Sequence, residues 1–372
     1  MTDSTAPKTC VLINALHARS GGGVTYLRNV LPLLAQDERL DIHLFIENDQ
    51  IAIFHPIDER VRVHAFATAG SPSALALWEQ LILPVLGRVM GADVIFSPAN
   101  FGCLLSDRNV ILLRNAFSVV RVETRPGRWL YWGALSLMTL LSVFRSVKVL
   151  AVSDYAARAL TLGLWRWVKS KITVVHHGVS RRFLPATGVA RERFILIVAD
   201  IYVQKNLLNF FRAAEIVCRN FPDIRFKIVG ASIDPWYKGQ VKSLVKSLGL
   251  EDRVEFLGRR PVEEILDLYR KCMFLAFPST AETFGNPLVE AMACGAPIAC
   301  SNTSAMPEIV GDVALFFDPF EPASIAEACV RMIESAELRE SLGARGLMRA
   351  RQFSWETCSQ QVADALVRAG AR

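Results

Sequence analysis

Residues 278–297 hold the side chains whose types and spacing are best suited to chemistry. They follow an apolar run at residues 273–277, which is typical of a buried parallel strand. After a loop, a helix is predicted to begin with Asn286 as its N-cap and Pro287 in its first position, and Gly295 favours an early end. A loop that leads into a helix directs backbone N–H groups and the positive end of the helix dipole at one point. The segment therefore predicts an anion site of the kind that holds phosphate.

Two carboxylates flank this predicted anion site. Glu282 lies in the loop, and Glu290 lies one turn into the helix. Carboxylates repel phosphate and accept hydrogen bonds from hydroxyls, so we expect hydroxyl groups as their partners. The combination suits a nucleotide sugar. The alternative is a pair of ordinary solvated acids, since acids are favoured in the first turn of a helix.

The same segment closely resembles the Glu-x7-Glu signature of the retaining glycosyltransferases of family 4, including the Phe-Gly, Glu-Ala-Met-Ala and Gly-x-Pro elements around it. Residues 307–311 and 317–319 also fit the family pattern. In that family the second Glu binds the ribose hydroxyls and the first lies near the donor sugar. The resemblance therefore assigns the ribose to Glu290 and the transferred sugar to Glu282, and it implies the GT-B fold.

The composition of the chain limits which classes of protein it can belong to. The chain has 372 residues, 52% of them hydrophobic and 21% charged, which indicates a globular protein large enough for two domains. Its net charge of +6 suits an anionic donor or a membrane surface, and no recognition helix or aromatic RNA-binding signature supports a nucleic-acid partner. The polar residues 1–8 lack the apolar core of a signal peptide, and the eight cysteines form no Cys-x-x-Cys pair. We therefore expect a reduced, cytoplasmic protein without disulfides or a zinc site.

One apolar stretch, residues 129–144, bears on membrane contact. It is shorter than the roughly 20 residues that a spanning helix needs. An ordinary core helix is favoured. The alternative is an interfacial helix with Trp129, Tyr131 and Trp132 at the headgroup level, which would make the protein peripheral on the inner face of the membrane.

Strand and helix patterns alternate along the whole chain, so we predict an α/β fold with parallel sheets wrapped by helices. Strands are expected at residues 10–16, 42–47, 61–66, 94–97, 110–113, 147–152, 172–176, 194–198, 226–229, 254–257, 273–277 and 298–300, and helices at 24–35, 75–90, 129–144, from 154, 206–220, 336–351 and 355–368. Turn-forming residues at 181–188 indicate a linker. The prediction is two Rossmann-like domains facing across a cleft: residues 1–183 on the acceptor side and 190–352 on the nucleotide-sugar side. Residues 353–372 would return as a helix to the first domain.

A glycine-rich turn, Gly21 to Gly23, follows the first predicted strand and opens the first helix. Glycine lets the backbone approach an anion closely, although a flexible connector explains the turn equally well. In position it resembles the Gly-Gly loop of family 4, which reaches the donor phosphate or the acceptor. The resemblance adds Gly22 and Gly23 to the predicted donor site.

Residues 199–206 resemble the Gly-Arg-x-x-x-x-Lys-Asn element of the family, whose Arg and Lys neutralise the diphosphate. Lys205 and Asn206 match, whereas Ala199 and Asp200 stand where Gly and Arg are usual. Negative charge that develops on the leaving diphosphate needs compensation. Lys205 is the candidate for part of this role, and the departure at Asp200 leaves the second cation unassigned.

Several shorter elements complete the comparison. Arg114 and Asn115 replace a His-Asp-like pair beside the acceptor, so a His is excluded there, and either residue is a candidate to hydrogen-bond sugar hydroxyls. Arg19 and Arg114 are candidates for the missing cation. The stretches at 78–80, 152–154 and 177–179 also resemble family elements, but a core tryptophan, a helix cap and a hinge turn explain them as well.

These observations predict a retaining hexosyltransferase that moves a sugar from a nucleoside diphosphate sugar to a hydroxyl acceptor, a glycan or a lipid-linked glycan. Glu282 and Lys205 are the predicted catalytic residues. The predicted donor-binding set is Gly22, Gly23, Lys205, Asn206, Thr283, Phe284, Gly285, Asn286 and Glu290. No Asp-x-Asp-like metal site is evident, so neither a metal nor another cofactor is expected. The alternatives are a catalytically inactive paralogue that binds sugar nucleotides, which Asp200 keeps open, and a nucleotide-sugar epimerase or a phosphorylase on the same fold.

Overall fold

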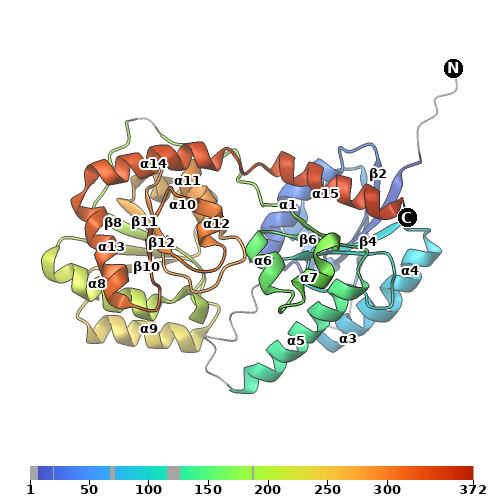
Figure 1. Ribbon diagram of the computed structural model, residues 1–372, viewed down its shortest axis with the longest axis horizontal. Coiled ribbons are helices and arrows are strands. Elements are labelled where there is room, and N and C mark those ends of the chain that lie inside the picture. The colour runs from blue at the N-terminus through green and yellow to red at the C-terminus, as the bar shows by residue number, and fades with distance from the viewer. Residues whose placement is uncertain (1–6, 20, 68–71, 115–125, 187, 372) are drawn as a thin grey trace. The chain divides into compact units, whose positions relative to one another are not determined.

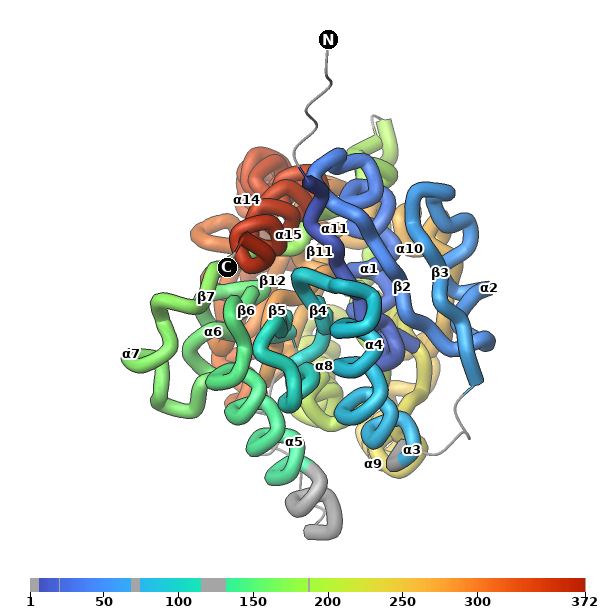
Figure 2. Tube along the Cα trace, turned by 90° about the vertical axis from the view of Figure 1, so that its right-hand side faces the viewer, coloured from blue at the N-terminus to red at the C-terminus, as the bar shows by residue number. Residues whose placement is uncertain are grey.

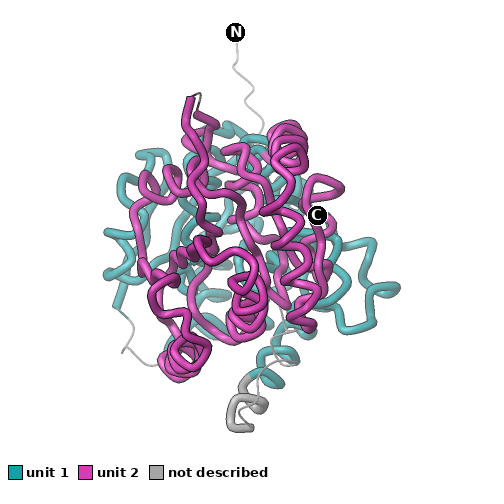
Figure 3. The backbone as a smooth tube through the Cα atoms, turned by 90° about the vertical axis from the view of Figure 1, so that its left-hand side faces the viewer, with its two compact units in different colours: residues 1–117, 127–178, 354–372 teal, residues 118–126, 179–353 magenta. Residues whose placement is uncertain are grey.

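The computed structural model describes residues 7–19, 21–67, 72–114, 126–186 and 188–371 (Figure 1). Two compact units share these residues (Figure 3). The first draws on the described parts of residues 1–117, 127–178 and 354–372, and the second on 118–126 and 179–353. Each unit contains a sheet in which all neighbouring strands are parallel, with seven strands in the first and six in the second. The predicted α/β class is confirmed.

In the parallel sheet of the first unit, the order in which successive strands are added reverses at the middle. Its strands are β1 (Thr9–Asn14), β2 (Leu40–Glu47), β3 (Val61–Phe66), β4 (Val94–Ser97), β5 (Asn109–Leu113), β6 (Lys148–Ala151) and β7 (Ile172–Val174). They follow one another in the order β3-β2-β1-β4-β5-β6-β7 (Figure 2). The order reverses between β1 and β4, and ligands of such sheets bind outside the carboxyl ends of the strands at this switch point.

Helices cover this sheet: α1 (Gly21–Leu34), α2 (Ile51–Phe54), α3 (Pro72–Leu77), α4 (Leu83–Val89), α5 (Pro126–Arg145), α6 (Asp154–Ala159), α7 (Trp165–Val168) and α15 (Trp355–Gly370). The predicted helix at residues 75–90 is present, since residues 72–89 are helical throughout, but a π-helical turn, Trp78–Ile82, separates α3 from α4. Pro84 lacks the N–H that a regular α-helix would need there. Ser153 caps α6 by accepting a hydrogen bond from the N–H of Ala156, 2.9 Å away.

The apolar stretch that raised the question of membrane contact forms α5. Within the described part of the chain, no helix is both long enough and apolar enough to cross a bilayer. Leu137, Leu141 and Phe144 of α5 are exposed large apolar side chains. The side chains of Trp129 and Tyr131, which the interfacial alternative invoked, lie outside the described residues.

The sheet of the second unit has the same kind of switch point. Its strands are β8 (Phe194–Val198), β9 (Arg225–Val229), β10 (Val254–Gly258), β11 (Phe274–Phe277), β12 (Ile298–Ser301) and β13 (Leu315–Phe317), in the order β10-β9-β8-β11-β12-β13. The three-residue strand β13 was not predicted. The order reverses between β8 and β11, so the loops at residues 199–206 and 278–285 both leave the sheet at its switch point.

The helices of the second unit are α8 (Leu207–Asn220), α9 (Pro235–Ser247), α10 (Val262–Lys271), α11 (Asn286–Ala293), α12 (Met306–Val310), α13 (Pro322–Glu334) and α14 (Ala336–Ala350). The predicted start of α11 needs a correction. Gly285 is the N-cap, with φ +90°, and Asn286 is already helical. A side chain at position 285 would be strained in this left-handed conformation, and its Cβ would lie 3.0 Å from Leu288 Cδ1, so glycine is required. The predicted end is confirmed, because Cys294 is the C-cap and Gly295 has φ +70°.

Helix α15 packs on α1, β1 and β4 of the first unit. Trp355, Val362 and Leu366 are among its buried side chains. The ring of His177 lies beside Trp355 at a centroid distance of 5.4 Å. Gly178 is close to the backbone at the start of α15, where a Cβ would lie 2.1 Å from the nitrogen of Trp355. The turn at residues 177–178 is therefore fitted to α15.

Candidate functional site

An ion pair joins the two loops at the switch point of the second unit. Lys205 ends the 3-10 turn Val203–Lys205 after β8, and its Nζ lies 2.5 Å from Oε1 of Glu282, which follows β11. The side chains are 11% and 13% exposed. Burial alone would lower the pKa of Lys205, but the Glu282 carboxylate and the Tyr202 phenol outweigh it and raise that pKa. Lys205 therefore keeps its positive charge beside the Glu282 side chain at the carboxyl edge of the sheet.

Asn206 fixes the geometry of this pair. Its backbone is left-handed, with φ +56°. Its side-chain Nδ2 donates to the carbonyl of Pro278 at 3.1 Å and to that of Pro319 at 2.6 Å. The N–H of Thr280 also donates to the carbonyl of Gln204, at 2.9 Å. The amide of Asn206, a predicted donor-binding residue, thus ties the loops together and holds Lys205 and Glu282 in place.

Glu290 lies on α11 beside a buried tyrosine. The hydroxyl of Tyr269 donates to Oε2 of Glu290 at 3.0 Å. Burial raises the pKa of Glu290 to about 7, and the hydrogen bond from Tyr269 opposes this shift. The carboxyl therefore changes its charge near neutral pH. Oε1 accepts no hydrogen bond from any described residue, which leaves it available to a ligand.

The loop between Glu282 and Glu290 is anchored by a hydrogen bond and by packing against the core. The N–H of Glu282 donates to Oγ of Ser304 at 2.9 Å. Thr283 and Phe284 are buried, and the Phe284 ring packs edge-on against Phe353 at 5.7 Å. The side chain of Phe284 therefore belongs to the core, and what this residue can offer a donor is its backbone.

Asp200, which stands where the family carries Arg, has a structural partner. Its Oδ1 accepts a hydrogen bond from the N–H of Ala231 at 2.6 Å. The neighbouring Gly230 packs so tightly on Ala199 that a Cβ would lie 2.0 Å from the Ala199 carbonyl oxygen. Asp200 therefore joins the loops that follow β8 and β9, and it supplies no positive charge.

In the first unit, the start of α1 lies against a half-buried arginine, Arg114. The Arg114 N–H donates to Oδ1 of Asn100 at 2.8 Å, and its Nε donates to the carbonyl of Pro98 at 2.7 Å. A Cβ on Gly23 would lie 2.5 Å from Nη2 of Arg114, whereas a Cβ on Gly22 would meet nothing within 4 Å. Burial lowers the pKa of Arg114, and Tyr26 opposes this. A side chain at position 23 would therefore force the guanidinium out of this position.

Two further residues were predicted: Asn115 on the acceptor side and Arg19 as a possible second cation. Asn115 lies outside the described residues. Arg19 forms ion pairs with Glu47 and, at 2.6 Å, with Asp49. Its charge is therefore compensated by two acids of the first unit.

A carboxylate–histidine pair at the first unit's switch point was missed by the sequence analysis. Glu79, on the π-helical turn, is 1% exposed. Its Oε1 accepts from Nδ2 of Asn14, the last residue of β1, at 2.5 Å, and its Oε2 lies 2.9 Å from Nε2 of His17. The His17 ring meets Phe101, which follows β4, edge-on at 4.9 Å. A signal was present in Glu79, which lies in the stretch at 78–80 that resembles a family element, but nothing in the sequence linked it to His17.

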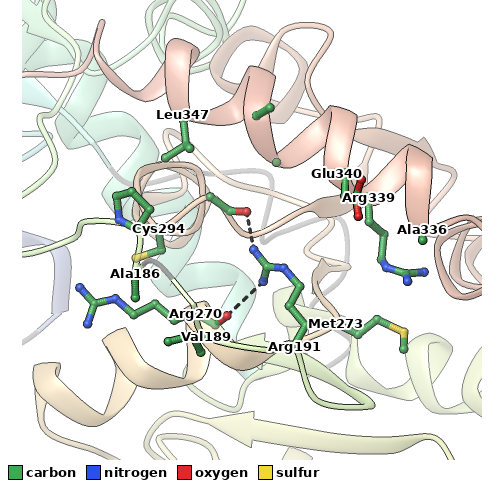
Figure 4. A pocket seen from close by; sticks show the side chains of 14 residues that line it. Ala186, Val189, Arg191, Arg270, Met273, Cys294, Ala336, Arg339, Glu340 and Leu347 are labelled. Atoms are coloured by element: carbon green, nitrogen blue, oxygen red, sulfur yellow. Dashed lines mark hydrogen bonds between the residues drawn. The ribbon is translucent and has the colours of Figure 1, made fainter.

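A separate pocket of about 520 Å³ lies in the second unit and contains none of the predicted site residues (Figure 4). Arg191 lies at its centre and donates from Nη2 to the carbonyl of Gly295 at 2.6 Å and from Nη1 to that of Cys272 at 2.8 Å. Arg339 similarly donates to the carbonyls of Met332 and Ile333. These arginines satisfy carbonyls at or just beyond helix ends, a structural role.

Residues 184–348 match the family model described as glycosyl transferases group 1. The matched segment contains Lys205, Glu282 and Glu290, so the ion pair and the Tyr269–Glu290 hydrogen bond both lie within the part of the chain that is similar to this family.

Similar proteins extend the group 1 match along the chain. The O-antigen chain mannosyltransferase B of Escherichia coli is 28% identical over 228 residues, which is 58% of this chain and 59% of that protein. An uncharacterised glycosyltransferase of Methanocaldococcus jannaschii is 29% identical over 279 residues, 72% of this chain and 73% of that protein. The chain therefore matches less than two thirds of the first of these relatives.

Solved structures share the complete fold. The Anabaena protein HepE in complex with UDP-glucose has a TM-score of 0.75 to this chain at 20% identity, over 96% of this chain and 99% of that one. At this identity the likeness shows the fold alone, and it confirms the predicted GT-B class.

Proposed function

We propose that this protein is a retaining glycosyltransferase that moves a hexose from a nucleoside diphosphate sugar to a hydroxyl acceptor. The observation that carries the proposal is the ion pair between Lys205 and Glu282 at the switch point between β8 and β11, next to the start of α11. A cation beside an acceptor of hydroxyl hydrogen bonds matches the two halves of a sugar diphosphate. The group 1 match over residues 184–348 supports the same assignment.

Each residue has a chemical role in this proposal. Lys205 compensates the negative charge that develops on the leaving diphosphate, together with backbone N–H groups of residues 283–285 and the positive end of α11. Glu282 accepts a hydrogen bond from a hydroxyl of the transferred sugar. Glu290 accepts hydrogen bonds from the ribose. No metal or other cofactor is assigned a role.

The reaction is a same-face displacement. The bond between the anomeric carbon and the diphosphate oxygen breaks while the acceptor oxygen forms its bond to that carbon on the same face. The acceptor proton passes to the departing phosphate oxygen, so no base from the protein is needed. Trapping a covalent adduct between a sugar and the enzyme would contradict this route.

The acceptor side of the proposal belongs to the first unit. Asn14, His17 and Glu79 meet at the switch point between β1 and β4, and Arg114 follows the adjacent strand β5. Polar groups at the carboxyl edge of a parallel sheet are placed for a ligand. We assign them to the hydroxyls of a glycan or lipid-linked glycan on the cytoplasmic side of a membrane, in keeping with the O-antigen mannosyltransferase among the relatives.

The second candidate function is a sugar-nucleotide-binding protein without transferase activity. Asp200 favours it, because the position where the family carries an arginine instead holds a carboxylate bonded to the N–H of Ala231. An epimerase on the same fold would convert the donor without any acceptor. Analysis of the products with and without an acceptor separates the three functions.

The first experiment is a thermal-shift screen with UDP-, GDP- and ADP-sugars on the wild type and on Glu290→Ala. A ligand that binds the folded state raises the midpoint by mass action. We expect one donor series to raise the wild-type midpoint and to lose that effect in the variant. A folded wild type that responds to none of these donors would contradict the proposed donor site. Turnover, with the anomeric configuration of the product determined by NMR, then tests retention.

A further inference from the structure

A cluster of potential metal ligands lies on the sheet of the first unit, at the amino ends of β1 and β2. Cys10 of β1 is directly opposite Asp41 of β2, and His43 follows Asp41 by two residues. Residues two apart on a strand, and residues opposite one another on neighbouring strands, point to the same face. One donor atom from each of the three residues lies within 4.8 Å of the other two.

The guanidinium of Arg62 lies against part of this cluster. Nη1 of Arg62, on the neighbouring strand β3, lies 3.1 Å from Oδ2 of Asp41 and 3.1 Å from Nε2 of His43. The cluster thus directs two electron-donating atoms at one point. The Arg62 side chain is 63% exposed, so it is able to leave into solvent, whereas the His43 side chain is only 8% exposed.

The hydrogen bonds fix the tautomer of His43. A guanidinium only donates, so Nε2 of His43 must accept, and its lone pair points into the cluster. The proton is then on Nδ1, which donates to Nε2 of His64 at 3.0 Å. Histidines that bind metals commonly donate their other N–H to a second group in this way, which sets the tautomer and the ring orientation.

We propose that Cys10, Asp41 and His43 form a zinc site in which the metal takes the place of the Arg62 guanidinium. Thiolate, imidazole and carboxylate are the ligands that Zn²⁺ prefers, and three protein ligands with one open position is a known coordination. Binding replaces the S–H bond of Cys10 by a Zn–S bond and releases the proton to solvent. Ligand distances of roughly 2.0–2.3 Å require the three side chains to close in slightly.

The site is independent of the proposed transferase function. Cys10 is near the amino end of β1, whereas Asn14 at the carboxyl end borders the acceptor-side cluster. The intervening residues span roughly 13 Å at about 3.3 Å per residue. Zinc there would cross-link β1 and β2 and stabilise the first unit, and the test does not depend on donor or acceptor.

The test uses the full chain, freed of any affinity tag and treated with a chelator. Co²⁺ serves as the spectroscopic probe, because coordination by a thiolate gives a charge-transfer band that other ligands do not. Zn²⁺ affinity is then measured by competition with a fluorescent chelator. We expect one equivalent of Co²⁺ to give the band and one equivalent of Zn²⁺ to remove it.

Four variants make the prediction specific. Cys10→Ser should abolish the band, while Cys218→Ser, at another partly exposed cysteine, should retain it. Asp41→Asn should weaken Zn²⁺ binding by about tenfold or more. Arg62→Ser should tighten binding, because the competing cation is gone. Circular dichroism checks that each variant is folded.

The cobalt band and the zinc affinities together decide whether the site exists. A band that is lost in Cys10→Ser and kept in Cys218→Ser, with tighter zinc binding by Arg62→Ser, supports the site. Absence of a band in the wild type, a band that survives Cys10→Ser, or weaker binding by Arg62→Ser overturns it. If Cys10→Ser does not fold, Asp41→Asn and Arg62→Ser decide the matter by moving the affinity in opposite directions.

Discussion

The affinity for a nucleotide should depend on the charge of Glu290. Burial raises the pKa of this carboxyl to about 7, and the proposed role requires its ionised form to accept hydrogen bonds from the ribose. The ionised fraction then rises about tenfold between about pH 6 and about pH 8. We expect the affinity of the wild type for a nucleoside diphosphate to rise by the same factor.

The assay is isothermal titration with UDP, GDP and ADP at both pH values. The terminal phosphate of these probes also titrates near pH 6, so Glu290→Gln provides the control. This variant keeps the size of the side chain and cannot ionise, and it should show the phosphate's contribution alone. A 2′,3′-dideoxy nucleotide, which lacks the ribose hydroxyls, should likewise lose the additional dependence in the wild type.

Stability should change with pH in the opposite direction. The pKa rises from 4.5 in the unfolded chain to about 7 in the folded one, so the folded state binds the proton more tightly. The stabilisation is complete below about pH 4.5 and is lost as the pH rises to about 7, by about 3 kcal/mol at most. Urea unfolding of the wild type and of Glu290→Gln measures the difference. If nucleotide affinity and unfolding free energy change with pH by the same amounts in the wild type and in Glu290→Gln, the proposed ionisation of Glu290 is refuted.

Three further predictions concern the ion pair and the acceptor side. Lys205→Met should destabilise the second unit by about 3–5 kcal/mol, because it leaves the carboxylate of Glu282 unpaired. In urea unfolding, the double variant with Glu282→Gln should regain much of the lost stability. A double variant as unstable as Lys205→Met would contradict the pairing. Gly23→Ala should lower the thermal midpoint and the transferase activity, because its Cβ would lie 2.5 Å from the Arg114 guanidinium. Gly22→Ala is the matched control with open space, and equal effects of the two would exclude the guanidinium contact as the cause. Glu79→Gln should raise the KM for the acceptor and leave donor binding unchanged, since the new amide donates to His17 and reverses its tautomer; unchanged acceptor kinetics would remove this pair from the site.

Much of the fold could be predicted from the sequence, because buried parallel strands are continuous apolar runs. The strands at residues 61–66, 94–97 and 194–198 have the predicted limits. Strand β13 was missed because three residues are too few to show a pattern. The π-helical turn at Trp78–Ile82 was missed because its periodicity differs little from that of an α-helix over so short a stretch.

The candidate site was predictable only in part. The resemblance placed Lys205 and Glu282 in one site, and the structure brings them into contact although 77 positions separate them. It gave no account of Asp200, whose partner Ala231 follows a different strand. The contacts of His17 with Glu79, and of Cys10 with Asp41 and His43, depend on strand register and helix phase, which residue types alone do not reveal.

The packing of α15 sets an order for biosynthesis. Residues 179–353 of the second unit are nearly continuous along the chain, whereas the first unit is closed by α15, which covers α1, β1 and β4. Domains usually fold from the N-terminus onward as the chain emerges from the ribosome. Here the first sheet to be made must wait, with the surface beneath Trp355 and Leu366 uncovered, until residues 355–370 have been translated. A nascent chain stalled before residue 355 would therefore carry a finished second unit and an unfinished first one.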